Sequence, residues 1–196
     1  AAAAPPLIRE AMWSPAGNSF SEHGADLAQV PDAGDLKLSD DGAAARAEIQ
    51  AGIDRILDNK YRPIALCGDH SITYPIVRAV AKYHRGVTIL HIDAHADLYD
   101  EFEGDRCSHA CPFARIMEEQ LCARLVQVGI RTLTPHQRDQ IKRFRVDTIE
   151  MQHFPAGARP AVDGPVYLTI DLDGIDPAFA PGVSHREPGG LTVRDV

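Results

Sequence analysis

Apolar residues follow two different spacings along most of the chain. Some segments repeat them every three or four positions, as amphipathic helices do, and others are short apolar, β-branched runs typical of buried strands. The predicted helices cover residues 43–59, 72–83, 112–120 and 135–144. The predicted strands cover residues 63–67, 87–92, 124–129, 146–150 and 165–170. Because strands and helices alternate, we predict β-α-β units in a three-layer α/β/α fold with a mostly parallel sheet.

The two ends of the chain are less regular than its middle. Residues 1–40 are rich in Pro, Gly and Asp, which predicts surface segments and loops, and Ser39-Asp40-Asp41 predicts a cap for the helix that follows. Residues 191–196 resemble the first turn of a helix, so we expect a fragment of a longer protein. With no internal repeat or boundary in 196 residues, we expect one incomplete domain over 1–196.

Composition and charge exclude several classes of protein. A content of 44% hydrophobic and 24% charged residues is typical of a globular chain, and no apolar run has the length of a membrane-spanning helix. The net charge of −8 argues against nucleic-acid binding and suits a cationic substrate or metal ions. The chain starts with no secretory signal and its cysteines are too few for a disulfide scaffold, so we expect a cytoplasmic protein.

Three polar clusters follow predicted strands, at the edge where open α/β sheets place their sites. They are Gly68-Asp69-His70, Asp93-Ala-His95-Ala-Asp97 and Asp171-Leu-Asp173. Alternate side chains of an extended segment point to the same side, so each cluster can converge on one point.

Together the clusters predict a centre for two metal ions. Four carboxylates in one place would repel one another unless divalent cations neutralised them, with Asp93 and Asp171 placed to bridge. Oxygen ligands with only two imidazoles favour Mn²⁺ over a thiolate-bound metal. Isolated Asp-x-His and Asp-x-Asp pairs are usually loop or turn residues, but three such clusters after three apolar runs are hard to explain in that way.

The same motifs resemble the signatures of the ureohydrolase family, which includes arginase, agmatinase, guanidinobutyrase and formimidoylglutamase. The similarity rests on Cys67-Gly-Asp-His-Ser71, on Asp93-Ala-His-Ala-Asp97 and on the run from Tyr167 to Gly182. Residues 6–16 also resemble the Ile-Arg-Glu segment that these proteins carry near their amino terminus.

The resemblance implies a function and a role for each site residue. His70, Asp93, Asp97 and Asp171 would hold one Mn²⁺, and Asp93, His95, Asp171 and Asp173 would hold the second. The pair would activate water for attack on a guanidino carbon, releasing urea and an amine. His109 matches the proton-shuttling histidine of the family, and Asp176 would lie behind the metal ligands or in the Asp-Pro turn. The family also implies a homo-oligomer, a trimer or a hexamer.

The sequence departs from the family pattern in three places. Cys67 replaces a glycine, the usual first strand with its Gly-rich turn is missing, and the late segment whose Glu binds the guanidinium is not in these 196 residues. We therefore expect the chain to hold the metals but to lack part of the substrate contacts.

Two features bear on the guanidino substrate, and they disagree. The loop 99–105 is strongly acidic, which favours agmatine, hydrolysed to putrescine and urea, over arginine with its α-carboxylate. The segment 182–190 instead resembles plant-type arginases, and His185, Arg186 and Glu187 could line the substrate mouth or form a rim loop. We predict an agmatinase, with an arginase or another guanidino-acid or formimino hydrolase as the alternative.

Other classes of protein remain open at this point. Cys107-x-His109-x-Cys111 could suggest a zinc site, but no second pair completes a tetrahedral set. A metal-binding protein or fragment that has lost catalysis would keep the same clusters. A related metal deacetylase would use one zinc with fewer carboxylates than are present here.

Overall fold

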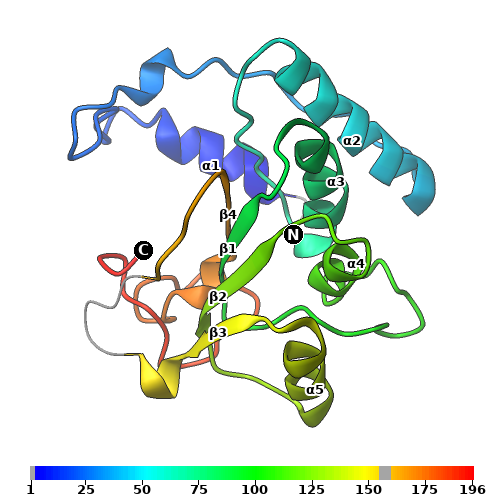
Figure 1. Cartoon of the computed structure of the whole chain (residues 1–196). Coiled ribbons are helices and arrows are strands. Elements are labelled where there is room, and N and C mark those ends of the chain that lie inside the picture. The colour runs from blue at the N-terminus through cyan, green and yellow to red at the C-terminus, as the bar shows by residue number, and fades with distance from the viewer. Residues whose placement is uncertain (1–2, 155–159) are drawn as a thin grey trace. The chain divides into compact units, whose positions relative to one another are not determined.

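The computed structural model describes residues 3–154 and 160–196, and it divides into two compact units (Figure 1). One unit ends at Asp69 and the other begins at His70, so each is described by itself. The expectation of a single domain therefore stays a prediction.

The first unit contains helix α1 (Ala4–Met12), a 3-10 turn η1 (Leu27–Gln29) and helix α2 (Gly42–Asp58). The prediction that residues 1–40 form only loops was wrong for α1. The prolines that suggested a loop lie in its first turn, where a helix needs no N–H donor from them. On the same helix, Arg9 binds Asp32 and Asp35, with its Nε 2.9 Å from the Asp32 carboxylate.

Helix α2 confirms the helix predicted over 43–59. Asp41 is its N-cap, and its carboxylate accepts the N–H of Ala44 at 2.8 Å. The strand predicted over 63–67 was wrong, because no strand forms there and Ile64 is 76% exposed. An apolar run does not make a strand without a neighbouring strand to bond, and Pro63 lacks a donor for such a ladder.

The second unit is built on a parallel sheet whose strands are ordered β3-β2-β1-β4. The strands are β1 (Thr88–Ile92), β2 (Arg124–Ile130), β3 (Asp147–Glu150) and β4 (Val166–Ile170). The helices are α3 (Thr73–Tyr83), α4 (Pro112–Glu118) and α5 (Pro135–Phe144). Short 3-10 turns are η2 (His70–Ile72), η3 (Met151–His153) and η4 (Leu172–Gly174). These elements confirm the predicted alternation of strands and helices from residue 72 onward.

The three helices of this unit pack on one face of the sheet. Val77 of α3 and Phe113 of α4 are fully buried against Ile89 of β1 in the main apolar cluster, and Ile141 of α5 packs at its border. The other face carries a smaller cluster that includes Leu191 from the C-terminal loops. None of the helices in the described residues combines the length and the hydrophobicity that crossing a bilayer requires.

A row of polar side chains crosses the middle of this sheet. The register places Thr169 of β4 opposite His91 of β1, His91 opposite Gln127 of β2, and Gln127 opposite Thr148 of β3. His91 and Gln127 are both fully buried. Such a row is uncommon in a parallel sheet, whose interior is normally apolar, so it calls for a functional explanation.

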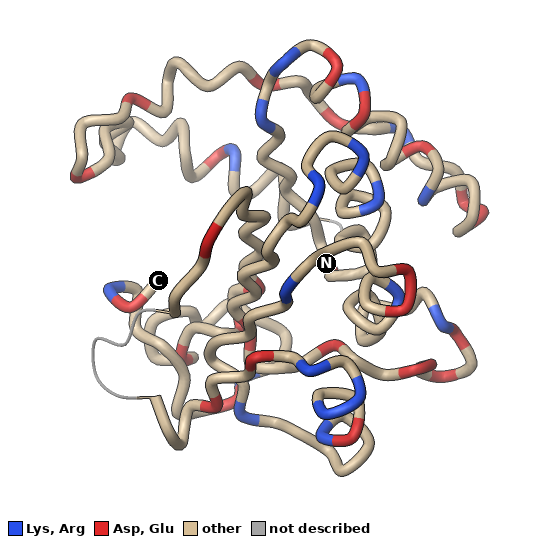
Figure 2. Tube along the Cα trace, in the orientation of Figure 1, with Lys and Arg blue, Asp and Glu red and all other residues tan. Residues whose placement is uncertain are grey.

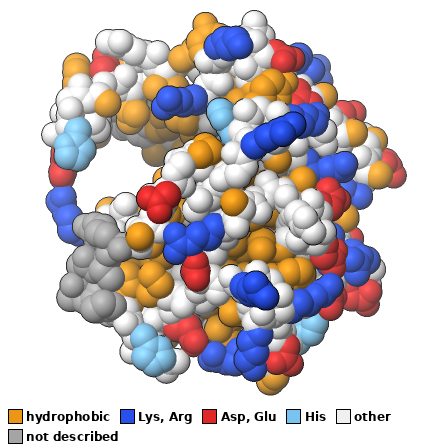
Figure 3. All heavy atoms as spheres, viewed as in Figure 1, with side chains coloured by type: hydrophobic (Ala, Val, Ile, Leu, Met, Phe, Trp, Pro, Cys, Tyr) orange, Lys and Arg blue, Asp and Glu red, His pale blue; other side chains and the backbone are white. Residues whose placement is uncertain are grey.

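Apolar side chains also remain at the surface. Leu168 of β4 is 52% exposed, and Val166 and Ile170 on the same strand are also exposed. Figure 3 shows hydrophobic side chains between charged ones over the face that it draws.

Candidate metal centre

The six predicted ligands, His70, Asp93, His95, Asp97, Asp171 and Asp173, converge within the second unit. Asp93 follows β1 and Asp171 follows β4, as expected, whereas His70 lies in η2, next to helix α3. The prediction that a strand precedes His70 was therefore wrong. The carboxyl ends of β1 and β4 lie side by side in the parallel sheet, which brings the cluster of Asp93 next to that of Asp171.

Tight turns, rather than extended chain, aim the carboxylates. The N–H of His95 donates to Asp93 Oδ1 at 2.6 Å, and the N–H of Asp173 donates to Asp171 Oδ1 at 3.0 Å. Asp97 has a left-handed backbone with φ of 48°. The predicted convergence is confirmed, but the extended-chain reason for it was wrong.

One half of the centre gathers around His70. Its Nδ1 lies 3.1 Å from Asp93 Oδ2, 3.0 Å from Asp97 Oδ2 and 3.8 Å from Asp171 Oδ2. Its Nε2 lies 3.0 Å from the hydroxyl of Thr169. The ring is therefore held on one side and presents its other nitrogen to three carboxylates.

The other half gathers around His95. Its Nδ1 lies 3.3 Å from Asp93 Oδ1 and 3.3 Å from Asp173 Oδ2. Asp93 thus directs one carboxylate oxygen toward each histidine, and it is the residue that the two halves share.

The electrostatics of the centre show a shortage of positive charge. Burial and the neighbouring Asp93 carboxylate raise the pKa of Asp97, and burial with the charges of Asp93 and Asp173 raises the pKa of Asp171. Burial opposes the charge of His95, but its bonds to Asp173 and Asp93 outweigh this effect and raise its pKa to about 10. Shifts in this direction are expected where buried carboxylates lie together without cations between them.

These residues fit divalent metal ions. Their nitrogen and carboxylate oxygen atoms suit hard or borderline ions such as Mn²⁺, and within the described part of the chain neither candidate group contains a cysteine. Asp93, His95 and Asp173 lie close enough to share one ion, as do His70, His91 and Asp93. Asp93 belongs to both groups.

Sequence reasoning missed residues that support the centre, among them His91 and Arg131. His91 Nε2 lies 2.8 Å from Asp93 Oδ2, and the signal for it was a lone histidine inside an apolar strand. Arg131, just after β2, donates to the backbone carbonyls of Asp173, Gly174 and Glu187, with the shortest bond, to Asp173, at 2.6 Å. It ties the loop that carries Asp173 to the loop that carries Glu187.

The remaining candidates lie around the centre. His185 Nδ1 is 3.8 Å from Asp173 Oδ2 and its ring is 5.2 Å from that of His95, so it lies at the rim of the centre. Asp176 accepts hydrogen bonds from the N–H groups of Gly189 and Gly190, so it holds the loop that also carries His185. His109 is exposed, and among the described residues its ring contacts Phe102 and Ser108 rather than the six predicted ligands.

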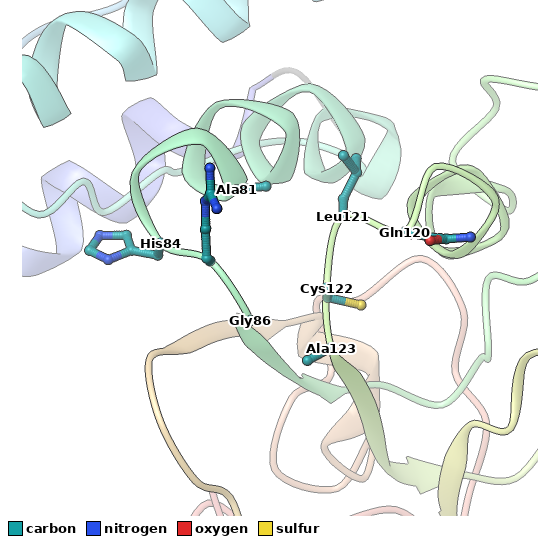
Figure 4. A pocket seen from close by; sticks show the side chains of 8 residues that line it. Ala81, His84, Gly86, Gln120, Leu121, Cys122 and Ala123 are labelled. Atoms are coloured by element: carbon teal, nitrogen blue, oxygen red, sulfur yellow. The ribbon is translucent and has the colours of Figure 1, made fainter.

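A pocket of about 340 Å³ lies elsewhere, at the opposite edge of the sheet (Figure 4). It is lined by Gly86 and Ala123, which precede β1 and β2, and by residues at the ends of α3 and α4 such as His84 and Leu121. The predicted ligands instead follow the carboxyl ends of β1 and β4, so this pocket is not the metal centre.

Comparisons with known proteins agree with this geometry. A family model described as the arginase family matches residues 1–196. Mitochondrial arginase 1 of Arabidopsis thaliana is 45% identical over 98% of the chain, and guanidinobutyrase of Pseudomonas aeruginosa is 40% identical over 86%. The structure of arginase from Medicago truncatula superposes with a TM-score of 0.90 at 44% identity, covering 98% of this chain and 66% of that one. The chain spans 62% of the Arabidopsis protein and 57% of the Pseudomonas protein.

Proposed function

Since the chain belongs to the arginase family, we propose that it hydrolyses a guanidino compound to urea and an amine with the help of two Mn²⁺ ions. The observation that carries the proposal is the shared position of Asp93, whose carboxylate reaches both His70 and His95. We assign the ions to the residues that the sequence predicts for each half of the centre. They are His70, Asp93, Asp97 and Asp171 for one ion, and Asp93, His95, Asp171 and Asp173 for the other.

The ions supply an activated water at neutral pH, because a divalent cation lowers the pKa of the water that it binds. The residues of this chain would hold the ligands in place and move the proton. Thr169 orients His70, and Arg131 fixes the backbone around Asp173. In this proposal His109 delivers the proton that the leaving amine needs, since an imidazole can exchange a proton near neutral pH. His185, at the rim, would contact the substrate.

We favour arginine as the substrate. The arginases of Arabidopsis and Medicago each match 98% of this chain. The sequence argument for agmatine rests on the acidic loop 99–105, but the carboxylate of Asp100 already accepts from Gln140 at 2.8 Å and from Arg143 at 3.3 Å. Figure 2 shows basic residues along α5, and the ion pair of Arg143 with Asp100 brings this helix to the loop. Part of the negative charge is therefore neutralised within the chain, and agmatine becomes the second candidate.

Compartment and assembly remain proposals as well. Cys107, Cys111 and Cys122 are free thiols, which suits a reducing compartment such as the cytoplasm. A homo-oligomer, a trimer or a hexamer, is proposed from the family resemblance, and light scattering on the purified chain would measure its mass.

The test is a urea assay on the Mn²⁺-loaded chain with arginine, agmatine and 4-guanidinobutyrate offered separately. We expect metal-dependent urea from arginine, reduced to background in Asp93→Ala. A matched control is Asp139→Ala, an exposed carboxylate on α5 that pairs with Lys142 and should leave activity unchanged. If only agmatine yields urea, agmatine replaces arginine as the proposed substrate. Absence of bound Mn²⁺ by elemental analysis would refute the metal centre itself.

A further inference from the structure

His91 is a fully buried imidazole in the middle of β1, and it touches the shared metal ligand from behind. Its Nε2 lies 2.8 Å from Asp93 Oδ2, and its Nδ1 lies 3.0 Å from the side-chain amide nitrogen of Gln127 on β2. Resting on the proposed function, we infer that His91 is a positioning residue, which Gln127 holds in one tautomer so that it donates to Asp93 and orients that carboxylate toward the two ions.

The tautomer follows from the hydrogen bonds of Gln127. Its amide nitrogen also lies 2.7 Å from the backbone carbonyl oxygen of Ala96. A carbonyl accepts only, so the nitrogen of the amide, and not its oxygen, must occupy that position. The same nitrogen therefore donates its second hydrogen to His91 Nδ1. With Nδ1 as acceptor, the ring proton lies on Nε2 and is donated to Asp93.

Further contacts hold this arrangement in place. The hydroxyl of Thr148 on β3 lies 3.5 Å from the amide oxygen of Gln127. The ring of His91 packs on that of Phe113, with centroids 4.1 Å apart. Thr148, Gln127 and His91 thus form a chain of contacts from β3 through β2 to the carboxylate of Asp93, which follows β1.

The geometry also separates this role from that of a metal ligand. His70, His91 and Asp93 are close enough to share an ion, but both ring nitrogens of His91 are already engaged. A nitrogen that donates a proton has no lone pair for a metal. Outer partners of this kind fix the direction and basicity of the ligands that they touch.

The experiment compares the whole chain with His91→Phe and His91→Gln. Phenylalanine keeps a ring against Phe113 and removes the donor, whereas glutamine keeps an N–H near the position of Nε2. For each protein we would measure the dissociation constant for Mn²⁺ by calorimetry, the Mn²⁺ paramagnetic resonance spectrum, and the melting temperature of the metal-free form.

We expect His91→Phe to weaken Mn²⁺ binding roughly 10- to 100-fold and to alter the resonance spectrum. Its metal-free melting temperature should fall modestly, because the buried amide of Gln127 loses its acceptor. His91→Gln should recover most of the affinity. If His91→Phe does not fold, the inference depends on His91→Gln, which supports it with near-parent affinity and overturns it with the loss expected of a missing ligand.

Two failures can be told apart. A parent chain that binds no Mn²⁺ refutes the proposed function and this inference with it. A parent chain that binds Mn²⁺, with His91→Phe binding within about twofold of it, leaves the proposed function standing and overturns only the role of His91.

Discussion

Gly129 and Gly174 pack against the backbone of Asp93 so closely that neither position has room for a side chain. A Cβ on Gly174 would lie 2.9 Å from the Asp93 nitrogen, and one on Gly129 would lie 2.8 Å from the Asp93 carbonyl oxygen. Gly129 also has φ of 97°, a conformation that favours glycine. The position of the shared ligand therefore depends on two residues that donate nothing to a metal.

We accordingly expect Gly174→Ala to push the Asp93 backbone out of place. Overpacking of this kind costs about 1–3 kcal/mol of unfolding free energy, measured by urea denaturation, and Mn²⁺ affinity should fall with it. Gly182→Ala is the matched control, because a Cβ there meets no atom within 4 Å. Unchanged metal affinity in Gly174→Ala would show that the backbone yields at no cost to the centre.

The assignment of proton delivery to His109 can be tested by itself. Since general acid catalysis contributes about 10²- to 10⁴-fold, His109→Asn should lower kcat by that order while Mn²⁺ binding stays the same. His153→Asn, another exposed histidine, serves as the control. Activity in His109→Asn equal to that of the control would transfer the role to another group, with His185 the first to examine because it lies beside His95.

The sequence contained the six predicted ligands but not the residues that hold them. Asp93 and His95 stand out because polar clusters rarely follow apolar strands without a reason. His91 touches Asp93 two residues away, but Gln127, which holds it, lies 36 residues along the chain, and Arg131 lies 42 residues from Asp173. Only the strand register and the loop positions reveal these contacts. Sequence spacing could not show which carbonyl Arg131 would meet.

Among the helices and strands, local sequence signals predicted an element well where its capping or its pairing with a neighbouring strand supported the same structure. Helix α5 has the predicted bounds, 135–144, and begins with a capping box in which Thr134 and Gln137 bond reciprocally. The run 63–67 is apolar like the predicted strands that did form, but it forms no strand. Pairing with a neighbouring strand is a tertiary property, and an apolar pattern alone does not supply it.

The capping box gives a prediction for α5. Removing the hydroxyl in Thr134→Ala leaves the N–H of Gln137 without its 3.3 Å acceptor and should cost about 1 kcal/mol of unfolding free energy. Thr134→Ser keeps the acceptor and should stay close to the parent chain in urea denaturation. An equal loss in both variants would mean that the threonine methyl group, rather than the cap, stabilises the helix.

For the whole molecule, the charges of the metal centre link ion binding to pH. The pKa of His95 is raised from 6.5 to about 10 in the metal-free fold, so its protonated form stabilises the fold fully below pH 6.5 and that stabilisation is lost as pH rises toward 10. A metal ligand must be a neutral imidazole, so ions compete with that proton.

We therefore expect Mn²⁺ to bind more tightly as the pH rises from about 6.5 to about 8.5, with protons released on binding. Calorimetry in buffers of different ionisation enthalpy, under anaerobic conditions, would count the released protons. In His95→Asn this proton release should be smaller. Affinity that does not change over the range would contradict the charge balance described for the centre.

The divided carboxylate of Asp93 makes the two halves of the centre thermodynamically dependent on each other. In the proposed two-ion centre, an ion beside His70 would fix the carboxylate whose other oxygen faces His95, and the reverse would hold with the same coupling free energy. Occupancy of one half therefore alters affinity at the other by one common factor, whichever fills first. Metal uptake by this chain should accordingly follow a cooperative isotherm, positive or negative in sign, rather than the sum of two independent ones.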